Sequence, residues 1–106
     1  MKDPTFDEDG YPTDETLYAI TKWPHEDGYY ELMVFVSGTW HWPDFMYVNP
    51  IKNIFGEPVW EYTMITGGWS GNEDIVAALR NNPLFYAMCW RESHRGGKHV
   101  FEVKHE

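Results

Sequence analysis

The chain has one cysteine, few basic residues and no long apolar run, and each shortage excludes a class of protein. Its single thiol, Cys89, cannot form a disulfide within the chain, so we expect a reducing, cytoplasmic environment. Only 8 Lys and Arg accompany 17 Asp and Glu, and the formal charge of −9 disfavours direct binding to nucleic acid. No window approaches the ~20 uncharged apolar residues of a membrane span, and the start lacks the apolar core of a signal peptide. We therefore expect a soluble protein that neither binds nucleic acid directly nor enters a membrane.

The composition is nevertheless that of a chain that folds. The 106 residues are 42% hydrophobic and include six Trp, seven Tyr and six Phe, whereas disordered acidic chains are poor in aromatic residues. This length suits one domain of ordinary size, so we expect residues 1–106 to form a single domain. Pro4, Gly10 and Pro12 interrupt the first part, where nothing is periodic, and this predicts an extended lead-in over residues 1–12.

The charge is polarised along the chain. Most of the acidic excess lies in residues 1–31, whereas residues 90–106 are slightly basic. The basic residues of this last segment are Arg91, Arg95, Lys98 and Lys104. Because the two clusters come from opposite ends of the chain, the sequence indicates two surfaces of different character rather than a uniformly acidic one.

The N-terminal half predicts two helices. Thr13 supplies a capping hydroxyl before an acidic first turn, and Pro24 follows the apolar stripe, which predicts a helix over about 14–22. Residues 28–41 carry a second stripe with helical spacing, although the central run Met33–Val36 also has β propensity. The stripe consists of Tyr29, Leu32, Met33, Val36 and Trp40. We favour a helix there, and the sequence leaves a strand as the alternative.

The C-terminal half predicts a small sheet with one packed helix. Residues 42–57 are irregular, with a short strand at most over 45–48. Alternation predicts strands over about 59–66, 84–93 and 98–104, and an apolar stripe predicts a helix over about 71–81. The expected fold class is therefore α+β, with two N-terminal helices followed by a small mixed sheet.

The order strand, helix, strand has a consequence for the two glycine-rich turns of this half. Such a unit with short links favours a right-handed crossover and parallel strands. The turn at residues 67–73 and the hairpin turn at residues 94–98 would then lie at the same end of the sheet.

The same two turns carry a distinctive combination of motifs. Residues 66–73 read TGGWSGNE, and an Arg-Gly-Gly turn at residues 95–97 follows an aromatic segment. With these motifs and the opening GYPTDETL of residues 10–17, the chain resembles small proteins of tailed bacteriophages and prophages. The resemblance covers residues 10–24 and 60–103. It implies a viral origin and a location in the cytoplasm of an infected bacterium, and it implies no activity.

The first candidate site is formed by these turns. Glycines allow backbone N–H groups to face outward, a helix N-terminus favours anions, and Arg and Lys bind phosphate or carboxylate. The candidate ligand-binding residues are Trp69, Ser70, Asn72, His94, Arg95, Lys98 and His99. The alternative is structural, because Ser70 and Glu73 have the spacing of a capping box and the basic turn resembles an ordinary exposed hairpin tip.

The second candidate site is a surface for a protein partner. Spaced carboxylates can occupy a basic groove, and exposed Trp side chains contribute strongly to protein interfaces. The candidate residues are Asp7, Glu8, Asp9, Asp14, Glu15, Trp40 and Trp42. The alternatives are that the charge only maintains solubility and that the aromatic side chains are core residues.

Catalytic and metal-binding patterns are poor. The five histidines have neither the HExxH pattern nor zinc-ligand spacing, and Cys89 lies among apolar neighbours. We predict no catalytic residue, no metal site and no cofactor. The favoured function is a small non-catalytic phage protein that binds a host bacterial protein, for example a defence or nucleic-acid enzyme. The alternative function is binding of a nucleotide or another small anionic ligand, and the oligomeric state stays open.

Overall fold

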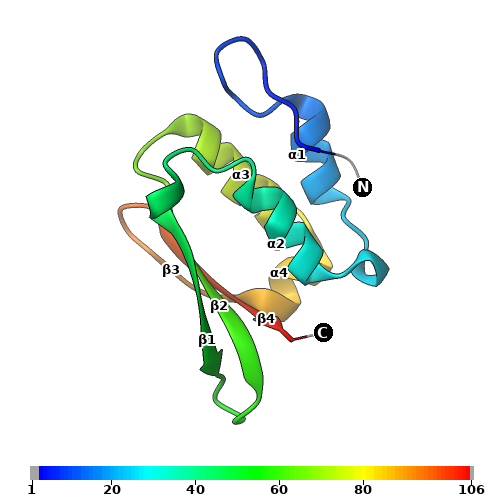
Figure 1. The fold of residues 1–106 in the computed structure, drawn as a ribbon, viewed down its shortest axis with the longest axis vertical. Helices are drawn as coiled ribbons and strands as arrows, with labels where there is room; N and C mark the ends of the chain where they lie inside the picture. Colours follow the sequence, from blue (N-terminus) through cyan, green and yellow to red (C-terminus); the bar gives the residue numbers. More distant parts are fainter. Residues whose placement is uncertain (1–2, 106) are drawn as a thin grey trace.

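Two helices followed by two strands occur twice along the chain in a computed structural model that describes residues 3–105 (Figure 1). The helices are α1 (Asp14–Thr21), α2 (Tyr29–Ser37), α3 (Ser70–Arg80) and α4 (Pro83–Cys89), with 3-10 turns η1 (His25–Asp27) and η2 (Pro43–Phe45). The strands are β1 (Met46–Lys52), β2 (Pro58–Ile65), β3 (Trp90–His94) and β4 (Lys98–Lys104). The predicted α+β class is confirmed, and so is the helix in residues 28–41.

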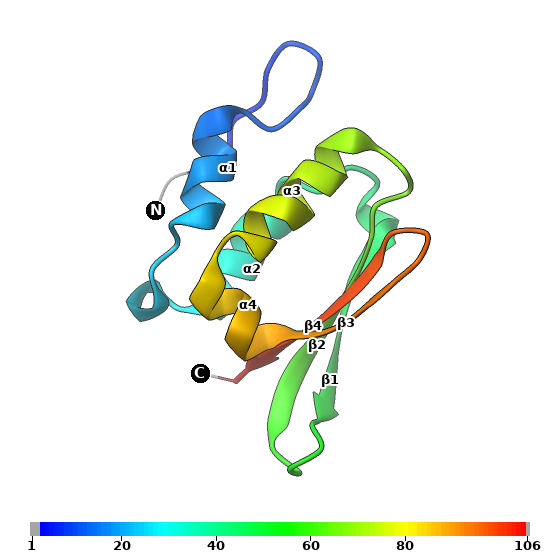
Figure 2. The ribbon, with the colours of Figure 1, turned by 180° about the vertical axis from the view of Figure 1, so that it is seen from behind.

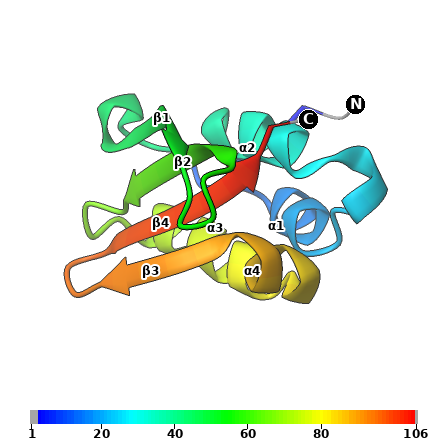
Figure 3. The same cartoon turned by 90° about the horizontal axis from the view of Figure 1, so that it is seen from below.

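The four strands form one sheet in the order β1-β2-β4-β3, in which every neighbouring pair is antiparallel (Figure 3). The predicted mixed sheet is therefore wrong. A tight turn with Gly96 and Gly97 at positive φ folds β4 back between β2 and β3. β2 and β3 still run in the same direction, so the two glycine-rich turns do meet, and the Thr66 N–H donates to the Gly97 carbonyl at 3.0 Å.

The segment predicted as one strand over 84–93 is instead a helix followed by a strand. The Asn82 side chain accepts from the Phe85 N–H at 3.3 Å, and Pro83 occupies the first turn of α4. An Asn cap followed by Pro starts a helix, although the same pair also marks the end of the preceding one. Phe85 and Cys89 are buried one turn apart while Leu84 and Met88 are exposed, which is a helical pattern too short for the sequence to reveal.

The sequence of residues 42–57 predicted a short strand at most over 45–48, but β1 is longer and forms a hairpin with β2. β1 pairs with β2 over seven residues, and Pro50 is tolerated because β1 is an edge strand. At the tip, the Asn53 side chain accepts from the N–H groups of Phe55 and Glu57 at 2.9 and 3.0 Å. The tip holds Ile54 and Phe55 in solvent, 91% and 78% exposed, at the end of the strands far from η2 (Figure 1).

The N-terminal segment is a folded loop rather than an extended lead-in. The Asp7 N–H donates to the Tyr11 carbonyl at 2.9 Å, and Phe6 and Pro12 form an isolated β-bridge. The Thr5 N–H donates to the Thr16 hydroxyl at 2.8 Å, which attaches the loop to α1. Residues 1 and 2 of the predicted lead-in lie outside the described part of the chain.

The core lies between one face of the sheet and the helices α2, α3 and α4 (Figures 2 and 3). α1 packs against α3 instead of against the sheet (Figure 2). The largest fully buried side chains of this core include Phe85, Phe101, Ile20, Leu32, Met33, Met64, Ile75 and Leu79. Three helices covering one face leave the other face of the sheet without a helical layer.

An ion-pair cluster occupies this outer face. A bulge between Trp90 and Glu92 interrupts the register of β3, and the guanidinium of Arg91 contacts Glu61 at 2.7 Å, Glu102 at 3.0 Å and Glu92 at 2.8 Å. The Arg91 guanidinium holds the pKa of the Glu92 carboxyl below its usual range. These contacts join three adjacent strands on a surface that no other element covers.

Asn82 gives a test of this packing. Its side-chain N–H groups donate to the carbonyls of Ile20 and Trp23 at 3.0 and 3.1 Å, and its oxygen caps α4. We expect Asn82→Ala to lower the free energy of unfolding by about 2–4 kcal/mol, because the start of α4 and the Trp23 carbonyl lose their side-chain partner and the Ile20 carbonyl keeps only backbone donors. Urea denaturation measures the change. The neighbouring exposed Asn81→Ala should change it by less than about 0.5 kcal/mol, and equal effects would contradict the assigned role.

Candidate functional site

Five aromatic rings form a continuous chain at one end of the molecule. Trp69, at the start of α3, contacts Tyr11 of the N-terminal loop and His41 of the α2–η2 connection, with ring centroids 4.8 and 4.5 Å apart. Trp42 contacts His41 at 4.6 Å and Phe45 at 5.7 Å. The chain of rings therefore joins segments that are far apart in sequence.

The buried side chain of Asn72 holds two of these segments together. It is 0% exposed, and its oxygen accepts from the His41 N–H at 2.9 Å. Its N–H groups donate to the carbonyls of His41 and Thr66 at 3.0 and 3.3 Å. Asn72 therefore fixes the position of residues 41–45 against the β2–α3 turn and has no donor left for a ligand.

The backbone of Trp42 is strained and its ring is exposed. Trp42 has φ 61°, and within residues 3–105 it is the one residue other than glycine with positive φ. Its ring lies on the backbone of Gly67, where a Cβ would come within 2.5 Å of Cζ3 of Trp42. The side chain stays 42% exposed, although burial would lower its free energy. Strain of this kind is found mostly at binding and catalytic sites.

An open hollow of about 400 Å³ lies beside this ring. Its lining residues are Trp42, Pro43, Asp44, Phe45 and Gly67. Phe45 is 39% exposed, and its ring is inclined by 56° to that of Trp42. The hollow therefore combines two accessible aromatic rings with one carboxylate.

Five further carboxylates lie in residues 7–15, the segment that Tyr11 joins to the ring chain. Asp7, Glu8 and Asp9 are exposed in the loop that Tyr11 closes, and the Asp7 side chain accepts from the N–H groups of Asp9 and Tyr11 at 2.9 and 3.0 Å. Asp14 and Glu15 are exposed in the first turn of α1. We call these five acids, together with Asp44 and the five rings, the aromatic–acidic end.

The structure separates the two tryptophans that the sequence placed on a partner surface. Trp42 belongs to the aromatic–acidic end, whereas Trp40 is 5% exposed and packs in the core. Trp40 therefore offers no surface to a partner. The two residues also differ in backbone conformation, since Trp42 has positive φ.

The predicted ligand-binding residues are divided between two places. Trp69 and Ser70 lie at the aromatic–acidic end, where the Ser70 and Tyr11 hydroxyls are hydrogen-bonded at 3.1 Å. The predicted capping box is wrong, since Trp69 is the N-cap of α3 and no side chain caps this helix. The exposed Arg95 and Lys98 lie at the tip of the β3–β4 hairpin, outside the described pockets.

His94 and His99 line a separate hollow of about 270 Å³ between the hairpin and α3. Glu73 and Arg80, two turns apart on one side of α3, line it as well. Arg80 is not among the candidate residues predicted from the sequence, although its spacing from Glu73 indicates a shared helix face. The His99 ring and the Ser93 hydroxyl are 2.8 Å apart, and burial lowers the pKa of His99, with the nearby Arg80 acting in the same direction.

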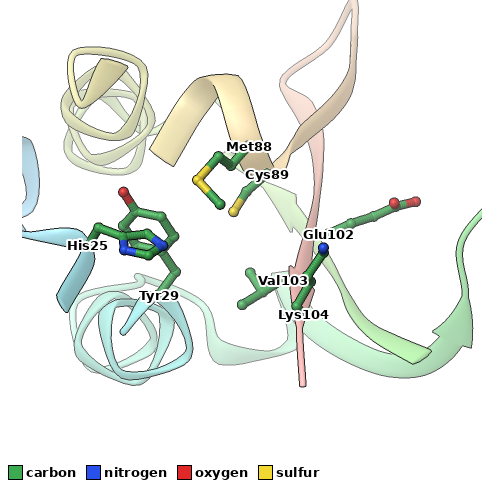
Figure 4. A pocket seen from close by; sticks show the side chains of 7 residues that line it. All are labelled: His25, Tyr29, Met88, Cys89, Glu102, Val103 and Lys104. Atoms are coloured by element: carbon green, nitrogen blue, oxygen red, sulfur yellow. The ribbon is translucent and has the colours of Figure 1, made fainter. Parts of the chain in front are cut away.

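A third, largely apolar cavity of about 270 Å³ lies between α2, α4 and β4 (Figure 4). His25 and Tyr29 face Met88 and Cys89 across it, while the Glu102 carboxylate points away toward Arg91. The Tyr29 hydroxyl is buried without a hydrogen-bond partner among the described residues. Burial raises the pKa of the Cys89 thiol to about 12, so this thiol is neutral at physiological pH and is a poor nucleophile.

Comparisons of the chain with protein-family models, curated proteins and solved structures found no match. Over residues 3–105, no helix is long and apolar enough to cross a membrane. The same residues contain no group of three or more His, Cys, Asp or Glu side chains that could hold a metal ion.

The environment of His99 gives a prediction about pH. Because the pKa of His99 is lower in the folded state than its ordinary value of 6.5, protons bind the unfolded chain more readily. The contribution of His99 to stability is therefore complete above about pH 7 and is lost as the pH falls through the folded pKa. We expect His99→Gln to reduce the loss of stability between about pH 7 and pH 5, measured by urea denaturation at each pH. An unchanged slope in His99→Gln would contradict the prediction.

Proposed function

We propose that the protein is a non-catalytic binding protein that docks on a basic surface of a protein partner through its aromatic–acidic end. The observation that carries the proposal is the exposed ring of Trp42, held on a strained backbone against Gly67. A side chain that only filled space would be more stable inside the core. Maintaining it in solvent fits a residue whose apolar surface is covered by a partner.

The composition of this end also fits protein binding. Exposed Trp and Tyr side chains often contribute most of the energy of an interface, and Trp42, Trp69 and Tyr11 are linked by ring contacts. The surrounding carboxylates favour a partner with positive charge, and long-range attraction would increase the rate of association.

The resemblance to phage proteins supports a particular kind of partner. A protein made in an infected bacterium meets host proteins in the cytoplasm, and many host enzymes that act on nucleic acids expose basic grooves. We therefore propose a host bacterial protein of this type as the partner, with inhibition of that protein as the outcome.

A second candidate function is binding of a small anionic ligand between α3 and the β3–β4 hairpin. Arg80, His94 and His99 line one hollow there, which supports this alternative. Glu73 lines the same hollow and opposes an anion. The sequence suggested Arg95 and Lys98 as the residues that would bind the anion, but neither lines this hollow. Binding to a protein partner is therefore the favoured function.

The proposed function is tested with Trp42→Ala and Phe45→Ala. The wild-type chain captures partners from a bacterial lysate, and the affinity of each captured protein is then measured by calorimetry. We expect the true partner to bind either variant at least about tenfold more weakly, and to bind the wild type more weakly at high salt.

Phe55→Ala is the matched control. Phe55 is an exposed aromatic residue at the opposite end of the β1–β2 hairpin, so its removal should leave the affinity unchanged. Circular dichroism verifies that all variants are folded. Partners that bind Trp42→Ala and Phe45→Ala as tightly as the wild type would contradict the proposal.

A further inference from the structure

We propose that the hollow lined by Trp42, Pro43, Asp44, Phe45 and Gly67 binds an organic cation, namely the guanidinium or ammonium group of an Arg or Lys side chain on the protein partner. This inference rests on the proposed function and names the chemical group that its site recognises. Three features of the hollow support it: the arrangement of the rings, the sign of the charge and the rigidity of the walls.

The rings provide two faces for a cation. The centroids of Trp42 and Phe45 are 5.7 Å apart, and the ring planes are inclined by 56°, so the two rings form adjoining walls rather than a stack. A cation within about 6 Å of a ring centroid is attracted by the negative face of the ring, and Trp gives the strongest attraction. Both side chains are partly exposed, so their surfaces are accessible from solvent.

The charge of the hollow has one sign. Among the residues that the structure describes, Asp44 is the one ionisable residue that lines it, and no Lys or Arg does. An anion would therefore meet a carboxylate with no compensating cation, and an uncharged apolar group would leave the Asp44 carboxylate partly desolvated. A cation is attracted by both the carboxylate and the rings.

The walls are fixed before any ligand binds. Asn72 holds His41 by two hydrogen bonds, and the Trp42 ring rests on Gly67, where no side chain fits. Because the ring is already ordered, binding loses little side-chain entropy. A fixed, open aromatic site is the arrangement by which proteins recognise ammonium groups.

The test uses small cations of known structure on the full chain. Choline and an N-acetylated arginine amide are titrated while the indole N–H signal of Trp42, assigned by its loss in Trp42→Ala, is followed by NMR. The neutral control is 3,3-dimethylbutan-1-ol, which has the shape of choline without its charge. We expect saturable shifts with both cations, and binding of the neutral analogue at least about fivefold weaker.

Three variants separate the contributions to this binding. Phe45→Leu keeps an apolar side chain and removes one π face, and Asp44→Asn keeps the shape and removes the charge. Each should weaken choline binding by about threefold or more. Asp27→Asn removes an exposed acid at the other end of α2, outside the aromatic–acidic end, and should leave choline binding unchanged. Gly67→Ala displaces the Trp42 ring and should weaken choline binding in a chain that still folds.

The outcomes distinguish this inference from the proposed function. Equal binding of choline and its neutral analogue, or no effect of Phe45→Leu and Asp44→Asn, would overturn the inference. A partner whose capture requires Trp42 but which loses no affinity in Asp44→Asn would overturn it as well, while the proposed function stands. Choline binding without any Trp42-dependent partner would overturn the assignment to a protein side chain and, with it, the proposed function.

Discussion

The aromatic–acidic end depends on the hydrogen bonds of one buried amide. Asn72 binds both the N–H and the carbonyl of His41 and also the carbonyl of Thr66. These bonds join the connection after α2 to the turn after β2. Neither His41 nor Thr66 belongs to a helix or a strand. The positive φ of Trp42, its contact with Gly67 and the ring chain through His41 to Trp69 lie beside that attachment, and the β1–β2 register, which pairs Met46 with Met64, brings the same two segments together. An alanine at this position would remove the side-chain partner of the His41 N–H and carbonyl, whereas the Thr66 carbonyl would keep the N–H of Trp69 at 3.2 Å.

The sheet and the helices divide the molecule into regions with different tasks. One face of the sheet and three helices form the apolar core, and the Arg91 cluster covers part of the other face. The ring chain lies in the loops at one end of β1 and β2. The acidic N-terminal loop contacts the start of α3 through Tyr11, and the basic β3–β4 hairpin meets the turn before that helix through the hydrogen bond between Thr66 and Gly97.

Periodicity predicted most of the elements because the core face of each repeats regularly. The stripe of Tyr29, Leu32, Met33 and Val36 identified α2, and all four side chains are buried. α4 escaped notice because a helix of seven residues shows only one repeat, and Asn82 both follows one helix and caps the next. The order of strands depends on long-range pairing, because the β3–β4 hairpin places β4 next to β2, and no local sequence pattern predicts this pairing.

The candidate site was predictable only in part, for a related reason. Both Trp40 and Trp42 are aromatic, and only the backbone at Trp42 decides which of them faces solvent. Asn72 looked like a ligand-binding residue because polar side chains near glycines often are, whereas its partners come from a segment 31 residues away. The composition indicated that a partner would contact aromatic and acidic residues. Which individual side chains are exposed to it depends on the packing of the folded chain.

Pro50 has a consequence for the behaviour of the protein in a crowded solution. It removes one N–H group from β1, an edge strand, and the bulge at Arg91 interrupts β3, the other edge. A chain approaching either side of the sheet therefore finds no uninterrupted row of donors and acceptors with which to extend it. The two interruptions oppose fibre formation in a molecule of which 18% is aromatic, and they do so without any change to the loops that are available for recognition.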